Sequence, residues 1–165
     1  MNKLEIIKSK ILSWEKLANE VLQWRFKNNN IVFTNGVFDL LHRGHVTYLS
    51  QAADLGDILI LGINSDYSVK KLNKGANRPI QDEQTRALIA ASLHVVSAVT
   101  IFDQETPDEL IKMVKPDVLV KGGDWKPEQI AGYDTVIASG GKVLTIDFVP
   151  GYSTTGLEKK IRSIN

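Results

Sequence analysis

Short apolar runs and longer amphipathic segments alternate along most of this chain. The runs typical of strands buried on both faces lie at residues 31–33, 58–63, 97–101, 118–120 and 142–148. The segments that we predict to be helices lie at residues 44–55, 64–71, 82–93, 106–115 and 153–164, with short helical pieces within 127–139. This alternation predicts parallel strands joined by right-handed crossovers, with helices on both sides of the sheet.

A further helix is predicted before the first strand, over residues 13–27, where Ser13 can act as its N-cap. The residues that share its apolar face are Trp14, Leu17, Ala18, Val21 and Trp24. In the helix at 44–55, the residues that we expect to face the core are Val46, Leu49, Ala52 and Ala53. We therefore predict a single α/β domain over residues 1–165. It would have a helical extension at 1–30 and a doubly wound, Rossmann-like core of five parallel strands at 31–165.

The charge and cysteine content narrow the functional classes. The 20 basic and 19 acidic residues nearly balance, which argues against a duplex nucleic acid as partner. The absence of cysteine excludes disulfides, thiolate metal sites and a cysteine nucleophile, and it fits a cytoplasmic protein. No apolar run approaches the roughly 20 residues of a membrane helix, and the N-terminus lacks a signal peptide's apolar region. We expect a cytoplasmic protein that acts on neither nucleic acid nor membrane.

The most informative stretch is residues 31–45. A buried strand turns through Asn35-Gly36 and delivers His42, Gly44 and His45 just before a helix begins. Free N–H groups and the positive end of the helix dipole make such a helix start a site for anions. The sequence therefore predicts that a nucleoside triphosphate binds here.

Two other polar segments, at 121–125 and 152–155, also follow predicted strands. Because the carboxyl ends of parallel strands lie at one edge of a sheet, these segments should converge on the histidines. Gly122 would let the backbone approach a nucleotide, unless the glycine pair here is simply a turn. Asp124 could bind a ribose or sugar hydroxyl, and Trp125 could stack on a base or a sugar.

Each candidate also has a plainer interpretation. The two histidines could bind a metal, but with Asp39 as the only acidic residue nearby they would make a poor zinc site. Ser153 could be an ordinary N-cap, worth about 1 kcal/mol. The basic residues after the second strand could be a solvated loop or a mobile lid that reaches phosphates. These residues are Lys70, Lys71, Lys74 and Arg78.

The motif His42-Arg43-Gly44-His45 after the first strand, with Ser153-Thr154-Thr155 opening the last helix, resembles the cytidylyltransferase-like nucleotidyltransferase superfamily. The resemblance implies that both imidazoles stabilise charge on the α-phosphate as pyrophosphate leaves, and that the hydroxyls hold the β- and γ-phosphates. The residues that it places against the nucleotide are Asn35, Gly36, Phe38, Gly44, Gly122, Ser153, Thr154 and Thr155.

Nearly the whole chain from Ser13 onward resembles the heptose 1-phosphate adenylyltransferase domains of bacterial ADP-heptose synthases. The segments that carry this likeness are residues 64–66, 78–80, 121–132 and 153–155. The resemblance implies transfer of AMP from ATP, with magnesium, to D-glycero-β-D-manno-heptose 1-phosphate, for lipopolysaccharide or surface-glycan precursors. It also implies a homodimer and a separate sugar kinase upstream. The alternative is a cytidylyltransferase acting on CTP and an alcohol phosphate such as glycerol 3-phosphate.

The same resemblance assigns further roles. Lys71 would lie nearest the α-phosphate, and Arg86 would bind phosphate. From its own place after the first strand, Asp39 could orient substrate, bind magnesium or only cap the turn, and the protein ligands of any metal stay open. A dinucleotide-binding module is disfavoured because the Gly-x-Gly-x-x-Gly pattern does not follow the first strand. A non-catalytic nucleotide sensor remains as the other alternative.

Overall fold

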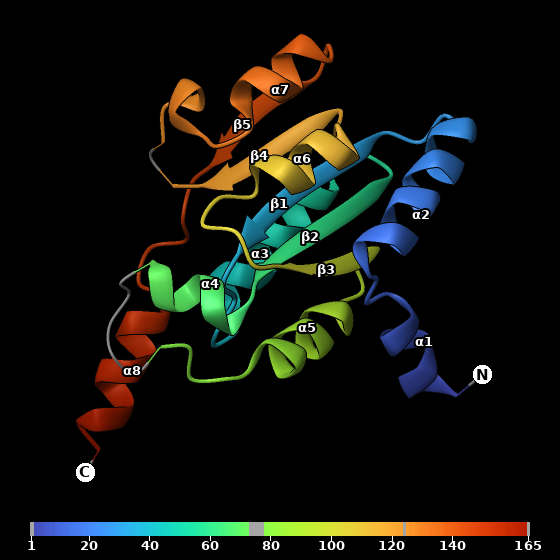
Figure 1. The fold of residues 1–165 in the computed structure, drawn as a ribbon. Coiled ribbons are helices and arrows are strands. Elements are labelled where there is room, and N and C mark those ends of the chain that lie inside the picture. Colours follow the sequence, from blue (N-terminus) through green and yellow to red (C-terminus); the bar gives the residue numbers. More distant parts are fainter. Residues whose placement is uncertain (1, 73–77, 124, 165) are drawn as a thin grey trace.

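The computed structural model of this protein describes residues 2–72, 78–123 and 125–164. Its centre is a sheet of five parallel strands in the order β3-β2-β1-β4-β5 (Figure 1). The strands are β1 (Ile31–Gly36), β2 (Ile58–Asn64), β3 (Ala98–Phe102), β4 (Val118–Gly122) and β5 (Lys142–Ile146). The predicted parallel five-stranded fold is confirmed. β4 runs two residues further than predicted, and β5 ends two residues sooner.

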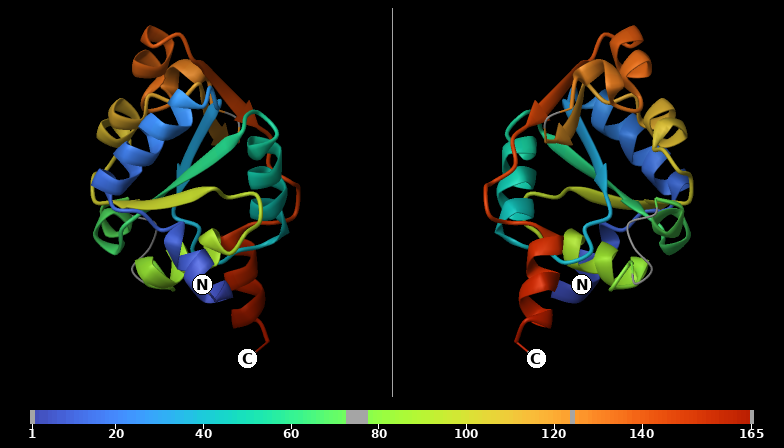
Figure 2. Two further views of the ribbon diagram at one scale, coloured as in Figure 1. Left: turned by 90° about the vertical axis from the view of Figure 1, so that its right-hand side faces the viewer. Right: turned by 90° about the vertical axis from the view of Figure 1, so that its left-hand side faces the viewer.

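Helices cover both faces of the sheet, and Figure 2 shows the sheet between the two layers. The helices are α1 (Lys3–Ser9), α2 (Trp14–Phe26), α3 (Arg43–Ala53), α4 (Asp66–Lys71), α5 (Glu83–Ala91), α6 (Asp108–Val114), the 3-10 turn η1 (Pro127–Gln129), α7 (Tyr133–Ala138) and α8 (Thr154–Arg162). The core on one face involves α2, α6 and α7, and the core on the other involves α3 and α5. Both figures show α8 projecting from the body of the protein. Within the described ranges, no helix is both long and apolar enough to cross a bilayer.

Alternate residues of the central strand serve the two cores. Ile31 and Phe33 of β1 pack in one cluster, and Val32 packs in the other. Successive side chains of a strand point to opposite faces, so an unbroken apolar run is what a sheet covered on both sides requires. Each such fully buried side chain stabilises the fold by roughly 1.5–3 kcal/mol.

The inward face of α3 differs from the prediction. Val46 is 45% exposed, whereas Tyr48 is 8% exposed and lies in the core beside Leu49 and Ala52. Tyr48 can enter the core because its hydroxyl pairs with the hydroxyl of Thr34 in β1 at 2.6 Å. A buried tyrosine hydroxyl needs such a partner, and its pair on another element cannot be identified from periodicity.

The N-terminal extension contains the predicted helix, α2, and also α1, which was not predicted. Asn2 caps α1, and Ile7 packs against the same core as α3 and α5. After α1 the chain runs along the outer side of β3, where Leu12 donates from its backbone N–H to the carbonyl of Val99 at 2.8 Å. The side chain of Lys10 donates to the carbonyls of Leu93 and Val96 in the segment between α5 and β3, which also fixes the extension to the core.

Candidate active site

The two central strands separate near their carboxyl ends. The parallel register joins residues 32–33 of β1 to residues 118–119 of β4, and both strands run three residues beyond it. Lys121 spans the separation by donating to the side-chain oxygen of Asn35 at 3.1 Å and to its carbonyl at 3.4 Å. The strand after β1 lies on one side of this pair and the strand after β4 on the other. Ligands of open α/β sheets bind at such a switch point.

His42 and His45 lie face to face at this edge, at the start of α3. Their ring centroids are 3.9 Å apart and the rings are inclined by 19°. His42 is the N-cap of α3, and its Nδ1 accepts from the backbone N–H of His45 at 3.3 Å. The neutral His42 ring therefore carries its proton on Nε2, where it is a donor. Nδ1 of His45 is buried and has no hydrogen-bond partner among the described residues.

The surroundings favour the neutral form of both rings. Burial and, to a smaller extent, repulsion from His42 lower the pKa of His45 to about 4, and the nearby backbone of Leu40 opposes this lowering. Burial also lowers the pKa of His42. The site therefore presents two uncharged imidazoles at pH 7, close enough that a nearby negative charge would act on both.

Two glycines allow close packing around this pair. A Cβ on Gly36 would lie 2.8 Å from the ring of Phe38, and a Cβ on Gly44 would lie 3.0 Å from Nδ1 of His42. Phe38 is nearly buried, has a positive φ of 48°, and places its ring centroid 5.1 Å from that of His45. Phe38 thus packs against the His45 ring, and its predicted contact with nucleotide stays a prediction.

The end of β4 also needs glycine. A Cβ on Gly122 would lie 2.7 Å from the ring of Phe148, and one on Gly123 would lie 2.6 Å from it. Gly123 also has a φ of 98°, a conformation that side chains with a Cβ rarely adopt. The two glycines thus let the largely exposed Phe148 ring pack closely against the end of β4.

The second predicted motif opens α8 beside the first. Ser153 is the N-cap, and its hydroxyl accepts from the N–H of Gly156 at 3.0 Å. Tyr152, just before Ser153, lies close to the start of α3. A Cβ on Gly44 would be only 3.3 Å from the Cβ of Tyr152. Arg43 donates to the Tyr152 hydroxyl at 3.3 Å. The structure therefore brings the two motifs together, with Thr154 and Thr155 in the first turn of α8.

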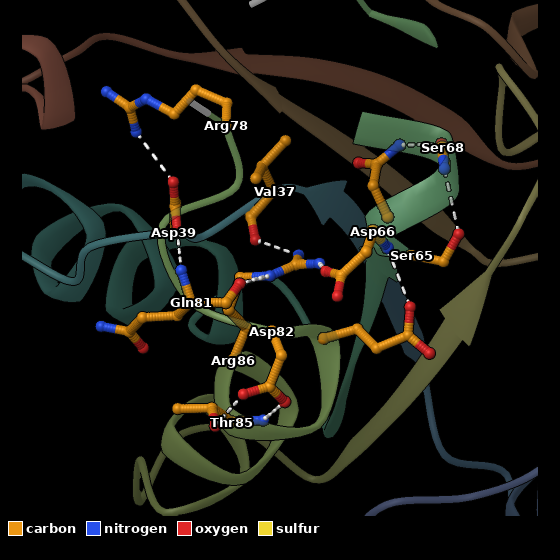
Figure 3. A network of polar contacts seen from close by, with 12 residues as sticks. Val37, Asp39, Ser65, Asp66, Ser68, Arg78, Gln81, Asp82, Thr85 and Arg86 are labelled. Carbon is orange, nitrogen blue, oxygen red and sulfur yellow. Dashed lines mark hydrogen bonds and ion pairs between the residues drawn. The ribbon is translucent and has the colours of Figure 1, made fainter. Parts of the chain in front are cut away.

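A polar network begins at Asp39, three residues before His42 (Figure 3). The carboxylate of Asp39, which is 2% exposed, accepts from Arg78 and from the N–H groups of Ile80 and Gln81, each at 2.9 Å. These contacts give Asp39 a structural role, because its carboxylate holds the segment before α5 against the loop that carries the histidines. A role toward substrate or magnesium stays a prediction.

The side chain of Arg86, to which the resemblance assigns phosphate binding, is occupied within the protein. Its side chain is fully buried, and its three nitrogens donate to the carbonyls of Gln81 and Val37 and to the carboxylate of Asp66, at 2.7–3.0 Å (Figure 3). A guanidinium held in this way joins three segments near the site, and its predicted contact with phosphate stays a prediction. The sequence could not show this, because a buried arginine and a surface arginine of a helix look alike in it.

The loop residues are less closely placed. Lys71 is exposed, and its Nζ lies 4.3 Å from the centroid of the Tyr67 ring. Trp125 is 52% exposed. Lys74 and Asp124 fall outside the described residues. For these four residues the proposed contacts with substrate remain predictions.

The described residues contain no group of three histidine, aspartate or glutamate side chains that could hold a metal ion. A hollow of about 640 Å³ lies between α6 and the η1–α7 segment, and none of its lining residues belongs to the predicted site. The chemistry is therefore assigned to the histidine edge of the sheet and not to this hollow.

Sequence reasoning missed two contacts that shape the site. Glu158 of α8 pairs with Arg78 at 2.8 Å, and Tyr48 fixes α3 to β1. The sequence places Arg78 in the basic loop after the second strand, but Glu158 is 80 positions away from it in the chain. Opposite charges so far apart give no local signal of pairing.

The chain is similar to known proteins over most of its length. Residues 33–156 match a family model described as cytidylyltransferase-like. The bifunctional protein HldE of Bradyrhizobium sp. (strain ORS 278) is 51% identical over 148 residues, which cover 90% of this chain and 30% of that protein. HldE of Klebsiella pneumoniae subsp. pneumoniae is 48% identical over 152 residues, covering 92% of this chain and 32% of that protein. The chain thus spans about a third of the length of these relatives.

Two crystal structures share the fold. A lipopolysaccharide core biosynthesis protein from Thermoplasma volcanium GSS1 superposes with a TM-score of 0.60 at 29% identity, covering 73% of this chain and 97% of that one. A pantoate–beta-alanine ligase from Francisella tularensis gives a TM-score of 0.56 at 14% identity, covering 92% of this chain and 76% of that one. The second likeness concerns the fold alone.

Proposed function

Because the chain belongs to the cytidylyltransferase-like family of nucleotidyltransferases, we propose that it transfers AMP from ATP to D-glycero-β-D-manno-heptose 1-phosphate, giving ADP-heptose and pyrophosphate. The choice of substrates is supported by the identity of about one half to HldE proteins and by the segment 121–132, which resembles heptose 1-phosphate adenylyltransferase domains. The likeness to a lipopolysaccharide core biosynthesis protein points to the same pathway. The product would serve lipopolysaccharide or other surface-glycan synthesis.

The observation that carries the proposal is the stacked pair His42 and His45 at a helix start on the sheet's switch point. Charge develops on the α-phosphate as pyrophosphate leaves, and positioned donors are what this transition state needs. The two rings are neutral without ligand. The negative triphosphate favours their charged forms, so we propose that ATP binding and proton uptake by the pair are coupled.

The remaining roles follow from position. Gly44 lets phosphates approach the start of α3, and the first turn of α8 holds the β- and γ-phosphates through Ser153, Thr154 and Thr155. The acceptor's own phosphate oxygen is a competent nucleophile at pH 7, so the reaction does not require a general base. Lys71 would neutralise phosphate charge from the exposed end of α4.

We propose that magnesium arrives with ATP. The described residues offer no set of side chains for an all-protein site, and Mg²⁺ commonly keeps several waters while it binds to substrate phosphates. The carboxylate of Asp39 already accepts three hydrogen-bond donors in the protein. Magnesium would supply charge neutralisation on the triphosphate.

The decisive experiment measures pyrophosphate release with ATP or CTP, each offered with heptose 1-phosphate or glycerol 3-phosphate. We expect turnover with ATP and heptose 1-phosphate. Turnover with CTP and glycerol 3-phosphate alone would replace the proposal by the cytidylyltransferase alternative. The absence of turnover in every pairing, with ATP still bound, would favour a nucleotide sensor.

The variant His45→Ala tests the role of the pair. Loss of one donor to a developing oxyanion typically lowers kcat about 100- to 1,000-fold, and we expect a loss of this order. His94→Ala is the matched control, since His94 is exposed at the end of α5. Equal activity of the His45→Ala and parent proteins would refute the assigned role.

The setting of the reaction is part of the proposal. We propose that the protein acts in the cytoplasm as a homodimer and receives its acceptor from a separate sugar kinase. Light scattering coupled to size-exclusion chromatography tests the dimer, because a monomeric mass at assay concentration would contradict it.

A further inference from the structure

Polar contacts determine where α8 lies. All nine residues of this helix are described, and none of them is buried in the core. At its start, Arg43 of α3 both donates to Tyr152 and lies over its ring, at 5.4 Å from the centroid. In its second turn, Glu158 accepts from Arg78 at 2.8 Å. A helix without core residues can shift when such contacts are removed, because little apolar burial holds it.

Arg78 connects α8 to the loop that carries the histidines. Its guanidinium donates to Asp39 at 2.9 Å through one nitrogen and to Glu158 at 2.8 Å through another. The arginine side chain is 12% exposed and that of Asp39 2%, whereas that of Glu158 is 26% exposed, so the pair with Asp39 is the better shielded from water. Charge-assisted hydrogen bonds are strong in such a setting, and the planar guanidinium can serve two carboxylates at once.

The carboxylate of Asp39 makes the connection rigid at its other end. It lies three residues before His42, is 2% exposed, and also accepts from the backbone of Ile80 and Gln81. Glu158 therefore contacts an arginine that cannot move independently of the histidine loop. The two motifs of the site, which are more than one hundred residues apart in the chain, are joined through this side chain as well as through the contact of Arg43 with Tyr152.

We propose that Arg78 is a positioning residue that, through Glu158, holds the first turn of α8 in register with the His42–His45 pair. The inference rests on the proposed function, in which Ser153, Thr154 and Thr155 of that turn hold the outer phosphates of ATP. Without the connection the turn samples other positions, so ATP binds more weakly. The histidines keep their place, so the chemical step after binding changes less.

The test begins with Glu158→Gln, which removes the charge but leaves Arg78 paired with the buried Asp39. We expect KM for ATP to rise about fivefold or more, with kcat within about twofold of the parent. Arg162→Gln is the matched control, because Arg162 is the exposed second partner of Glu158 and does not contact the histidine loop. It should leave both constants unchanged.

The same variant separates positioning from direct binding of phosphate by Arg78. If the arginine itself bound ATP, removing Glu158 would free it, and KM would stay the same or fall; that result would overturn the proposal. Arg78→Met should raise KM at least as much as Glu158→Gln, and Arg78→Lys should recover part of the loss. Because Arg78→Met leaves the buried Asp39 unpaired, its folding is checked by circular dichroism, and Glu158→Gln decides if it does not fold.

A second readout does not depend on turnover. The chain has no cysteine, so spin labels can be placed uniquely by Gln51→Cys in α3 and Ser163→Cys at the end of α8. We expect a narrow distribution of label distances in the parent and with Arg162→Gln, and a broader one with Glu158→Gln. An unchanged distribution would overturn the proposal, as would a broader one with unchanged affinity for Mg–ATP measured by calorimetry. If ATP and the sugar phosphate gave no turnover, the proposed function would fail, and the label distances and calorimetry would still decide this inference.

Discussion

The neutral state of His45 makes a specific prediction about acid stability. Its pKa is about 4 in the folded protein, against 6.5 for a histidine exposed to water. Between these values the unfolded chain binds a proton that the folded chain does not, so stability must fall as pH falls through this range. Replacing His45 by glutamine removes this contribution and leaves the other titrating groups in place.

The size of the effect follows from the shift. Each pKa unit corresponds to 1.36 kcal/mol, which for the full shift gives an upper limit of about 3 kcal/mol. Since His45 is only partly buried, water screens part of the penalty, and we expect about 1–2 kcal/mol. The unfolding free energy of the parent minus that of His45→Gln should therefore fall by that amount between pH 7.5 and pH 4.5.

Urea unfolding at several pH values between 7.5 and 4.5 measures this difference for the parent, His45→Gln and His94→Gln. Toward acid pH, we expect the unfolding free energy of the parent to fall relative to that of His45→Gln. The difference in unfolding free energy between the parent and the exposed control His94→Gln should stay constant. If the offset between the parent and His45→Gln did not change with pH, the ring would not be held neutral by burial. The proposed proton uptake on ATP binding would then lose its basis.

Three further changes test the packing around the site, each followed by urea unfolding. Gly123→Ala should lower the free energy of unfolding by more than Gly140→Ala does. Both glycines have positive φ, worth about 1–2 kcal/mol, but only a Cβ at Gly123 would meet the Phe148 ring. Equal losses in the two variants would contradict the close approach. Tyr48→Phe should cost about 1–2 kcal/mol, because it leaves the buried Thr34 hydroxyl without its partner, and a neutral result would show that the pair contributes nothing. Arg86→Met should cost about 3–5 kcal/mol by leaving a carboxylate and two carbonyls unpaired, whereas a surface phosphate-binding arginine could be lost at little cost to stability.

The sheet could be predicted from the sequence because its chemistry is local. A run such as residues 58–63 must be covered on both faces, and five such runs separated by helical segments leave few arrangements other than a parallel sheet. The convergence of the histidine motif and Ser153 followed from the same rule, because both segments come directly after strands. Where a residue type and its neighbours in the chain decide the outcome, sequence reasoning was sufficient.

The errors concern partners that lie far apart in the chain. The burial of Arg86 was not foreseen, because its acceptors come from three separate segments that meet only in the folded protein. Val46 was expected in the core but is exposed, and Tyr48 lies there because Thr34 provides a partner for its buried hydroxyl. The helix α1 was missed because its apolar residues are interspersed with lysines, and docking on the core, more than its own short sequence, stabilises it.

The segment between α1 and α2 has a consequence for handling the protein. An open edge strand offers unpaired backbone groups to any other strand, and proteins commonly cover such edges to prevent aggregation. Here Lys10 and Leu12 exchange backbone hydrogen bonds with Val99 of β3, so the extension acts as a guard on that edge. A shortened protein that begins at residue 13 would expose β3 as a template. We expect it to aggregate by strand pairing at concentrations that the full chain tolerates.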